Sequence, residues 1–231
     1  MPDRLADTVI PVPPPTLLPV AGTPARFPVR RVYCIGRNYA EHAAEMGHDT
    51  REPPFFFQKN PDDLDPSGSF PYPDRSAEVH HEAEMAVFLH SGGTDIPVAA
   101  SLNHVYGYAL ALDMTRRDLQ AQMKAAGRPW EVAKAFARSA PVGPIHPAAE
   151  VGHPAHGALT LHLNGALRQE GDLAQMIWSV PEMIAILSEY VPLAAGDVIL
   201  TGTPAGVGPV SRGDLLEVAH ARLGRLAVTV A

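Results

Sequence analysis

Apolar residues in this chain come in short runs separated by polar and turn-forming residues. Such runs, several of them rich in β-branched or aromatic residues, predict strands, here at 31–35, 55–57, 78–89, 106–112 and 159–163. Helical character is predicted in three segments, at 39–46, 115–126 and 179–190. The 24 prolines and 19 glycines are spread along the chain, which favours many short strands and tight connections. The pattern therefore predicts a β-rich α+β fold.

Turn and capping residues mark several of the expected boundaries. Asn164-Gly165 has turn chemistry after a predicted strand, and Ser179 with Glu182 three residues later forms the start of a capped helix. The segment 60–73 is rich in Pro, Asp, Gly and Ser and is expected to be loop. The tail, 197–230, is expected to form short strands around a glycine-rich loop.

The domain organisation expected from length is simple. A chain of 231 residues with 46% hydrophobic content can bury the core of one large domain. Residues 1–28 are expected to form a proline-rich extension, in which we expect the segment 11–24 to lie extended on the surface because proline fixes φ and removes backbone donors. Residues 29–231 are then expected to form a single catalytic domain.

Charge and composition exclude several classes of partner. The formal net charge of −7 leaves no basic surface for nucleic acid or an anionic membrane. Apolar runs are far shorter than the roughly 20 residues of a membrane span, and the first residues lack the apolar core of a secretory signal. The single cysteine, Cys34, agrees with a reducing compartment. We expect a cytoplasmic protein that does not bind membranes or nucleic acid.

The first candidate chemistry is carboxylate chemistry. Glu82 and Glu84 lie two apart in a predicted strand, so their side chains share one face. Asp113 ends an apolar strand, where an uncompensated charge is costly. Three such oxygen donors suit Mg²⁺, Mn²⁺ or Ca²⁺. The bland alternatives are a solvated edge strand for the glutamates and a helix N-cap for the aspartate. His80 and His81 point to opposite faces and are interpreted as supporting or structural.

A second set of residues is suited to acid–base work. His42 and Glu45 lie i, i+3 on a short predicted helix, so the carboxylate can orient the imidazole; a surface ion pair is the alternative. Lys134 lies among small and apolar residues. It either extends its ammonium to solvent or presents a cation to a developing enolate.

Two further features are candidates for substrate binding. Arg117 and Gln120 lie i, i+3 on the helix predicted after Asp113 and together can hold a carboxylate or carbonyl; a solvated helical face is the alternative. The segment 201–209 contains Gly202 and Thr203 in a loop whose amides can approach an anion closely. It lacks the Gly-Lys-Ser/Thr ending of a phosphate-binding P-loop.

Taken in order, these features resemble the fumarylacetoacetate hydrolase family over roughly residues 30–231. The resemblance is carried by Gly36-Arg37-Asn38-Tyr39 with His42 and Glu45, His81-Glu82-Ala83-Glu84, the block 111–118 around Asp113, Lys134, and the loop 201–209. It implies a mixed β-rich fold of packed sheets, or β-roll, with peripheral helices, usually as a homodimer.

The resemblance also implies a site and a reaction. Glu82, Glu84 and Asp113 are the implied ligands of Mg²⁺ or Mn²⁺, which holds a small dicarboxylic keto acid. A His42–Glu45 dyad then activates water on a segment that often orders only with ligand. Lys134 stabilises the enolate formed when the carbon–carbon bond breaks. Substrate contacts are implied for Arg117, Gln120, Thr203 and Gly202.

Within the family, segments 27–33 and 51–59 resemble fumarylpyruvate hydrolases of gentisate-type aromatic breakdown. The segment Asp172-Leu173-Ala174 departs from the Asn, Thr or Ser residues expected there. The same scaffold also serves acylpyruvate hydrolysis, oxaloacetate decarboxylation and dienedioate isomerisation or decarboxylation. An alternative of another class is a catalytically silent metal-binding scaffold, against which His42, Glu45 and Lys134 argue.

Overall fold

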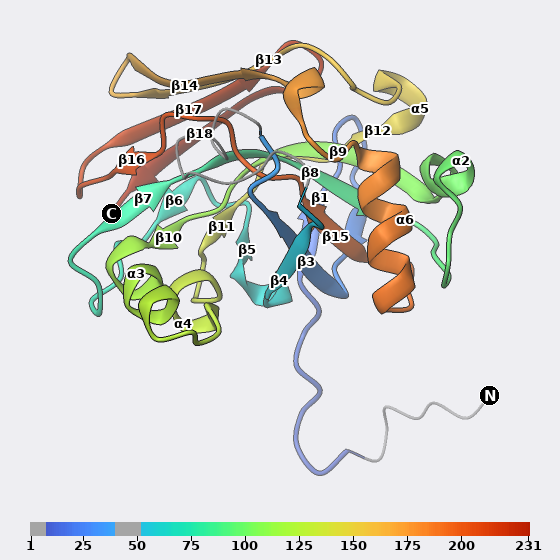
Figure 1. Ribbon diagram of the computed structural model, residues 1–231, viewed down its shortest axis with the longest axis horizontal. Coiled ribbons are helices and arrows are strands. Elements are labelled where there is room, and N and C mark those ends of the chain that lie inside the picture. The colour runs from blue at the N-terminus through green and yellow to red at the C-terminus, as the bar shows by residue number, and fades with distance from the viewer. Residues whose placement is uncertain (1–7, 40–51) are drawn as a thin grey trace.

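The computed structural model describes residues 8–39 and 52–231. Two large sheets dominate the molecule (Figure 1). The first has six strands in the order β12-β9-β8-β15-β3-β4, and the second has five in the order β14-β13-β17-β18-β6. Three small sheets, β10-β7-β16, β11-β5 and β1-β2, complete the strand pairing. This mixed architecture with few helices confirms the expected α+β class.

The six-stranded sheet comprises β12 (His146–Pro147), β9 (Val105–Leu112), β8 (Ala83–Leu89), β15 (Asp197–Leu200), β3 (Arg31–Gly36) and β4 (Phe55–Lys59). The five-stranded sheet comprises β14 (Ala166–Asp172), β13 (Ala158–Leu163), β17 (Leu215–His220), β18 (Gly224–Val230) and β6 (Ser69–Phe70). The small sheets use β10 (Thr115–Arg116), β7 (Val79–His81), β16 (Gly208–Pro209), β11 (Ala140–Pro141), β5 (Leu64–Asp65), β1 (Leu17–Pro19) and β2 (Arg26–Pro28).

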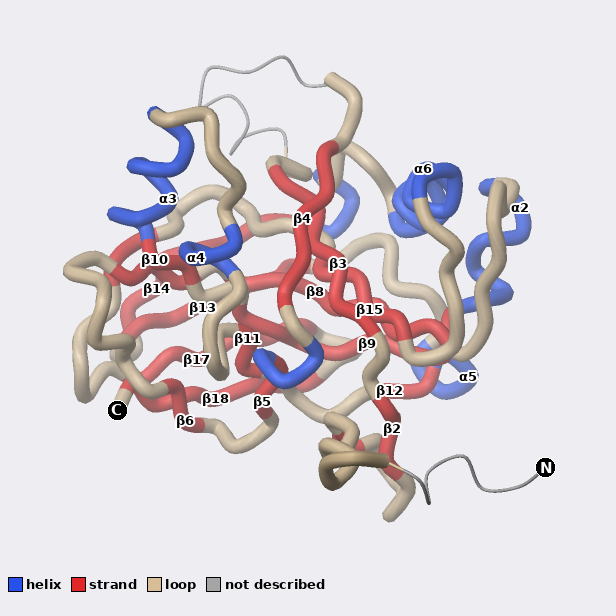
Figure 2. Tube along the Cα trace, turned by 90° about the horizontal axis from the view of Figure 1, so that it is seen from below, coloured by secondary structure: helices blue, strands red, loops and turns tan. Residues whose placement is uncertain are grey.

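Short helices surround the sheets: α2 (Val98–Ser101), α3 (Arg117–Ala125), α4 (Glu131–Lys134), α5 (Ala148–Val151) and α6 (Val180–Tyr190), with 3-10 turns η1 (Pro61–Asp63), η2 (Leu102–His104) and η3 (Leu173–Gln175). Helices α3 and α4 lie to one side of β4, and α6 and α2 lie to the other (Figures 1 and 2).

Both faces of the six-stranded sheet are buried, by alternate side chains of the same strands. In β8, Met85 and Val87 belong to one apolar cluster, which also holds residues of β13 and β17, whereas Ala86 and Phe88 belong to a second. A strand covered on both faces is apolar at nearly every position, which explains why residues 85–89 of β8 and most of β9 appear in the sequence as continuous apolar runs.

The second face is covered in part by the N-terminal segment, and here one expectation is wrong. Three residues are buried in the second cluster: Leu18 in β1, Val20 directly after β1, and Phe27 in β2. The part of the segment from residue 16 onward therefore does not simply lie on the surface. Residues 8–15 before it are largely exposed and carry most of the local prolines. The division into an extension at 1–28 and a domain at 29–231 stays a prediction.

Most expected elements are present, with local differences. The helix expected at 179–190 forms with its capping box at Ser179, and Asn164 and Gly165, both at positive φ, turn β13 into β14. The run 78–89 is two strands interrupted at Glu82, and the helix expected from 115 starts at Arg117. The loop expected at 60–73 contains η1, β5 and β6. The helix expected at 39–46 lies outside the described residues except Tyr39.

Candidate metal centre and active-site pocket

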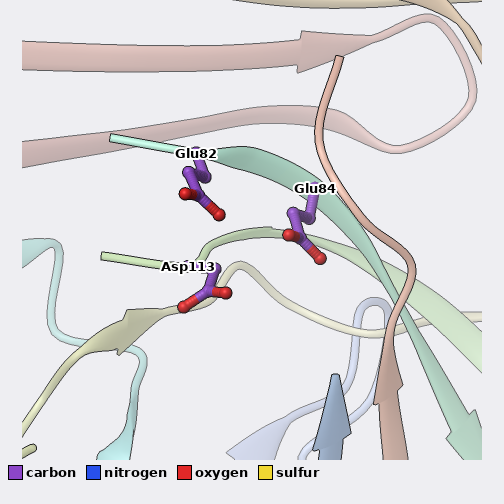
Figure 3. Close-up of side chains that lie close together, drawn as sticks. All are labelled: Glu82, Glu84 and Asp113. Carbon is purple, nitrogen blue, oxygen red and sulfur yellow. The ribbon is translucent and has the colours of Figure 1, made fainter. Parts of the chain in front are cut away.

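The three predicted carboxylates meet at one end of β8 and β9. Glu82 lies at the break between β7 and β8, Glu84 is the second residue of β8, and Asp113 follows β9 directly. The two strands pair antiparallel with Ala83 opposite Leu112, and the Asp113 N–H donates to the Glu82 carbonyl over 2.9 Å. One oxygen from each side chain lies within 4.8 Å of the others. Figure 3 shows the three side chains close together.

The burial and position of these side chains decide between the alternative interpretations that the sequence left open for Glu82, Glu84, Asp113 and Lys134. Glu82, Glu84 and Asp113 are 6%, 2% and 1% exposed, so the glutamates are not on a solvated edge strand. The N-cap of α3 is Arg116, so Asp113 does not cap that helix. Lys134 is 2% exposed and does not extend to solvent.

Buried cations compensate part of this negative charge. The Lys134 ammonium lies 2.9 Å from Glu82 Oε2 and 2.7 Å from Asp113 Oδ2, and it donates to Thr115 Oγ1 over 2.6 Å. The Arg117 guanidinium contacts Glu82 Oε1 at 2.5 Å. Charges removed from water require such pairing, and Glu82 receives two cationic partners.

The pKa shifts follow from this arrangement. Burial opposes ionisation of Glu82, but Lys134 and Arg117 outweigh burial and hold its pKa well below the usual range. Burial, followed by the negative charges of Asp113 and Glu82, raises the pKa of Glu84 well above its usual value. Burial disfavours the charged form of Lys134, but the carboxylates of Asp113 and Glu82 outweigh it and raise the lysine pKa. Glu84 is therefore the carboxylate that most lacks a positive charge.

A second buried lysine, Lys59 of β4, lies behind the cluster. Its ammonium is 2.8 Å from Asp113 Oδ1 and forms an ion pair with it, although that oxygen accepts no hydrogen bond from the described residues. The Lys59 protons are directed instead at Ser139 Oγ, 2.9 Å away, and at the Lys134 carbonyl.

These donors fit a hard divalent cation. The three side chains supply only carboxylate oxygens, Asp113 keeps an oxygen without a hydrogen bond, and Glu84 receives one backbone hydrogen bond, from Gly202 N–H over 2.8 Å. Oxygen donors of this kind suit Mg²⁺ or Mn²⁺ and do not distinguish between them. No other group of this kind is found among residues 8–39 and 52–231.

The carboxylates form part of the lining of a pocket. It brings together the predicted Arg117, Gln120, Lys134, Gly202 and Thr203 with residues that sequence reasoning did not select as site residues: Ile35, Gly36, Arg37, Phe55, Phe57 and Trp130. Phe55 and Phe57 stack edge-on against Trp130, at ring-centroid distances of 5.3 and 6.1 Å. The pocket thus has a charged side and an aromatic wall.

Arg117 and Gln120 are joined by a hydrogen bond of 2.6 Å from Arg117 Nη1 to Gln120 Oε1. Both are half-buried, so the pair is not a fully solvated helical face. His80 contacts Glu78 and Arg117, and His81 is buried; neither belongs to the carboxylate group. His42 and Glu45 lie outside the described residues.

A buried glutamine, Gln169 of β14, was missed by the sequence reasoning. Its Oε1 accepts from Ala83 N–H at 3.0 Å, and its Nε2 donates to the Pro204 carbonyl at 2.9 Å, which fixes the amide orientation because backbone N–H can only donate and backbone C=O can only accept. Nε2 therefore donates to Thr203 Oγ1, 2.8 Å away. The signal available in the sequence was a lone glutamine in Arg168-Gln169-Glu170.

The same orientation settles the tautomer of His81. Its Nδ1 lies 2.9 Å from Gln169 Oε1, which can only accept, so Nδ1 carries the proton. Burial lowers the pKa of His81. In the neutral ring Nε2 is left unprotonated.

No helix in the described part of the chain is long and apolar enough to cross a membrane.

The chain is similar to several known proteins in sequence and in structure. The structure is similar to that of fumarylpyruvate hydrolase from Pseudomonas aeruginosa in complex with Mn²⁺ and pyruvate, with 48% identity, a TM-score of 0.95, and coverage of 97% of this chain and 99% of the other. The sequence is 44% identical over 194 residues to oxaloacetate tautomerase YcgM of Escherichia coli, covering 83% of this chain and 89% of that protein.

It is also 43% identical over 189 residues to the mitochondrial oxaloacetate tautomerase FAHD1 of Mus musculus, covering 81% of this chain and 86% of that protein. Tautomerisation was not among the reactions expected from the sequence. A family model, fumarylacetoacetate (FAA) hydrolase C-terminal, matches residues 31–231, which include both large sheets and every described residue of the pocket. The chain therefore belongs to the fumarylacetoacetate hydrolase family.

Proposed function

We propose that this protein is a metal-dependent hydrolase that cleaves the carbon–carbon bond of a 2,4-diketo acid, with fumarylpyruvate as substrate and fumarate and pyruvate as products. The observation that carries the proposal is the group of three buried carboxylates within 4.8 Å, set in a pocket with the cations Arg117 and Lys134. The likeness to a fumarylpyruvate hydrolase that holds Mn²⁺ and pyruvate, over 97% of this chain, supports the substrate.

In this proposal Glu82, Glu84 and Asp113 hold Mg²⁺ or Mn²⁺. When bound, the ion supplies Lewis acidity toward the oxygens of the diketo acid. Arg117 and Gln120 bind the carboxylate beside these oxygens, and the Gly202–Thr203 loop orients the substrate from the opposite side. Lys134 keeps a positive charge next to the developing enolate, because its raised pKa maintains the ammonium form.

The hydrolytic step needs a general base, for which we propose His42 oriented by Glu45. His42 takes a proton from water, and the water oxygen adds to the distal carbonyl carbon. When this adduct collapses, the bond between that carbon and the neighbouring methylene carbon breaks. Fumarate leaves from one side, and the electron pair of the broken bond remains as the enolate of pyruvate, which is then protonated at carbon.

Oxaloacetate tautomerisation is the second candidate, favoured by the relatives at 43% and 44% identity. It uses the same enolate but consumes no water, since a proton only moves between carbon and oxygen. A residue pair that activates water is then dispensable. Oxaloacetate decarboxylation, shorter acylpyruvates and dienedioates use the same enolate site.

We further propose that the protein acts as a cytoplasmic homodimer in aromatic catabolism. The resemblance of segments 27–33 and 51–59 to fumarylpyruvate hydrolases supports the pathway. The assembly is tested by light scattering after gel filtration, where a mass near 24.7 kDa, that of one chain, would contradict the dimer.

The deciding experiment is turnover of fumarylpyruvate, followed by loss of its enol absorbance with product analysis, in Mn²⁺, in Mg²⁺ and in excess chelator. We expect metal-dependent release of equal amounts of fumarate and pyruvate. Oxaloacetate is assayed in parallel for keto–enol exchange and for CO₂ release. If the protein does not cleave fumarylpyruvate but rapidly exchanges the keto and enol forms of oxaloacetate, the hydrolase proposal is wrong and the tautomerase proposal is supported.

A further inference from the structure

Arg37 has an unusual backbone conformation at the edge of the pocket. Its φ is +58°, in the left-handed region that residues with a side chain seldom occupy. Its guanidinium carbon lies 5.5 Å from the centroid of the Phe55 ring, and Arg37 lines the same pocket as the three carboxylates. Strained residues persist only where their surroundings impose the conformation.

The surroundings that impose it are its two neighbours. A side chain on Gly36 would meet the Phe55 ring at 2.0 Å, so only glycine lets the ring pack against this turn. Asn38 is buried, and its side-chain amide donates to the carbonyls of Trp178 and Thr201, each at 2.9 Å, while its Oδ1 accepts from Trp178 N–H. Arg37 is therefore held between two anchored residues with its side chain over the aromatic wall.

The charge balance of the pocket singles out Arg37. Of the three cations that line it among the described residues, Arg117 is paired with Glu82, and Lys134 with Glu82 and Asp113. Arg37 forms no ion pair with any described residue, and its Nε is buried without a hydrogen bond. A buried donor of this kind that lacks an acceptor is costly, and a bound anion removes the cost.

We propose that Arg37 is the specificity-determining residue that binds the distal carboxylate of the substrate, the one remote from the metal. The inference rests on the proposed function for the identity of the substrate. A dicarboxylic diketo acid has two anionic ends: Arg117 and Gln120 receive the one beside the diketo oxygens, and the aromatic wall of Phe55, Phe57 and Trp130 accommodates the carbons that lead to Arg37. Substrates that end in a methyl group leave Arg37 unpaired.

The test compares two substrates that differ only at this end, fumarylpyruvate and crotonylpyruvate, in which a methyl group replaces the distal carboxylate. Wild type, R37M, R37K and the surface control R225M are assayed in Mn²⁺. We expect R37M to lower kcat/KM for fumarylpyruvate by about 10- to 100-fold, the range for a hydrogen bond to a charged group, mainly through KM. R37K retains part of the activity, and R225M behaves as wild type.

The result for crotonylpyruvate decides the interpretation. We expect R37M to leave its kcat/KM within about twofold of wild type, because no contact to that substrate is lost. An equal loss on both substrates would show that Arg37 only supports the fold of the turn, and an unchanged value for fumarylpyruvate would also overturn the proposal.

A binding measurement separates this inference from the proposed hydrolysis. Calorimetry with fumarate and crotonate as probes needs no turnover, and we expect R37M to weaken only fumarate. If the wild type cleaves neither diketo acid while fumarate binding still depends on Arg37, the hydrolase proposal fails and the anion site stands. Fumarate binding that is equal in wild type and R37M overturns the site.

Discussion

Glu84 differs from the other two carboxylates in what surrounds it. Glu82 and Asp113 each contact a lysine ammonium directly, whereas within residues 8–39 and 52–231 Glu84 receives one hydrogen bond, from the Gly202 N–H. Burial and its two negative neighbours therefore raise its pKa. In the metal-free protein this charge is the least compensated of the three, and a divalent cation relieves it most.

We expect E84Q to lose Mn²⁺ affinity by more than roughly 100-fold. Replacing a residue that only supports a metal ligand typically lowers metal affinity about 10- to 100-fold, and replacing a ligand itself should lower it more. The amide oxygen can still accept from Gly202, so the metal-free variant should be at least as stable as the wild type. Calorimetric titration with Mn²⁺ and denaturant unfolding in chelator check both statements. E150Q, on the exposed surface, is the matched control. Wild-type Mn²⁺ affinity in E84Q would remove Glu84 from the ligand set.

The pH dependence of the same variant has a definite sign. A carboxyl whose pKa is raised in the folded state contributes stability at low pH, and this contribution is lost as the pH rises through the folded pKa. Metal-free wild type should therefore lose stability relative to E84Q as the pH rises above the usual carboxyl range. Over the same interval Mn²⁺ binding to the wild type strengthens, because the metal requires the ionised form.

At the scale of elements, the site depends on contacts between segments distant in sequence. The single residue between β7 and β8, Glu82, is where the run 78–89 changes from one sheet to another. Gln169 of β14 binds the backbone next to this break and the loop after β15 at once. Its amide joins elements that the hydrophobic pattern predicts separately, and no periodicity marks such a bridge.

The Gln169 contact predicts how the Thr203 hydroxyl is used. Because Nε2 donates to Thr203 Oγ1, the hydroxyl proton is not used in this contact, and we predict that it is donated into the pocket. Q169E keeps the acceptor for Ala83, but its new carboxylate oxygen faces both the Thr203 hydroxyl, which turns toward it, and the Pro204 carbonyl, which it repels. We expect kcat/KM to fall at least about 10-fold, with a smaller loss when Q169E is added to T203V than when it is added to the wild type.

The double-mutant cycle in kcat/KM is the measurement for this prediction, with T203S as the variant that restores the hydroxyl and Q175E, on the exposed turn after β14, as the charge control. Additive losses from Q169E and T203V would mean that Gln169 acts on the site by another route than Thr203. Equal melting temperatures of the variants are required, because Gln169 is buried.

At the scale of the whole molecule, the N-terminal segment completes the cover of the six-stranded sheet. Leu18, Val20 and Phe27 are buried with residues of β8 and β15, and Phe27 packs edge-on against Phe88 at a centroid distance of 5.3 Å. The prolines that make this segment appear irregular in sequence mostly precede the buried part. A strand pair formed from three-residue strands is too short to give an alternating pattern.

Truncation separates the two parts of this segment. Removal of residues 1–15 should change the unfolding free energy little. Removal of 1–28 deletes three buried side chains, whose burial is worth about 1.5–3 kcal/mol each, and exposes the face of the sheet against which they pack. We therefore expect a clear loss of stability only in the longer deletion, measured by denaturant unfolding with and without Mn²⁺. Equal stability of both deletions would show that the β1–β2 pair does not contribute to the core.

The sequence by itself determined the fold class, the main strands and the three carboxylates. Strand spacing places Glu82 and Glu84 on one face, and a charge at the end of an apolar run marks Asp113; these are local properties of neighbouring residues. The order of these carboxylates together with the segment 36–45, Lys134 and the loop 201–209 indicated the family and the class of keto acid substrates. His42 and Glu45 came from the same motif, and their role stays a prediction.

Only the tertiary structure decided what surrounds those carboxylates. Lys59, Gln169 and Arg37 come from β4, β14 and the turn after β3, and the Ala83–Gln169 contact joins residues 86 apart. Side-chain periodicity reports which face of its own element a residue occupies, but strand order, register and burial decide which elements meet. The paired cations, the hydrogen bond from Gln169 to Thr203 and the absence of an ion pair between Arg37 and the described residues all depend on which elements meet.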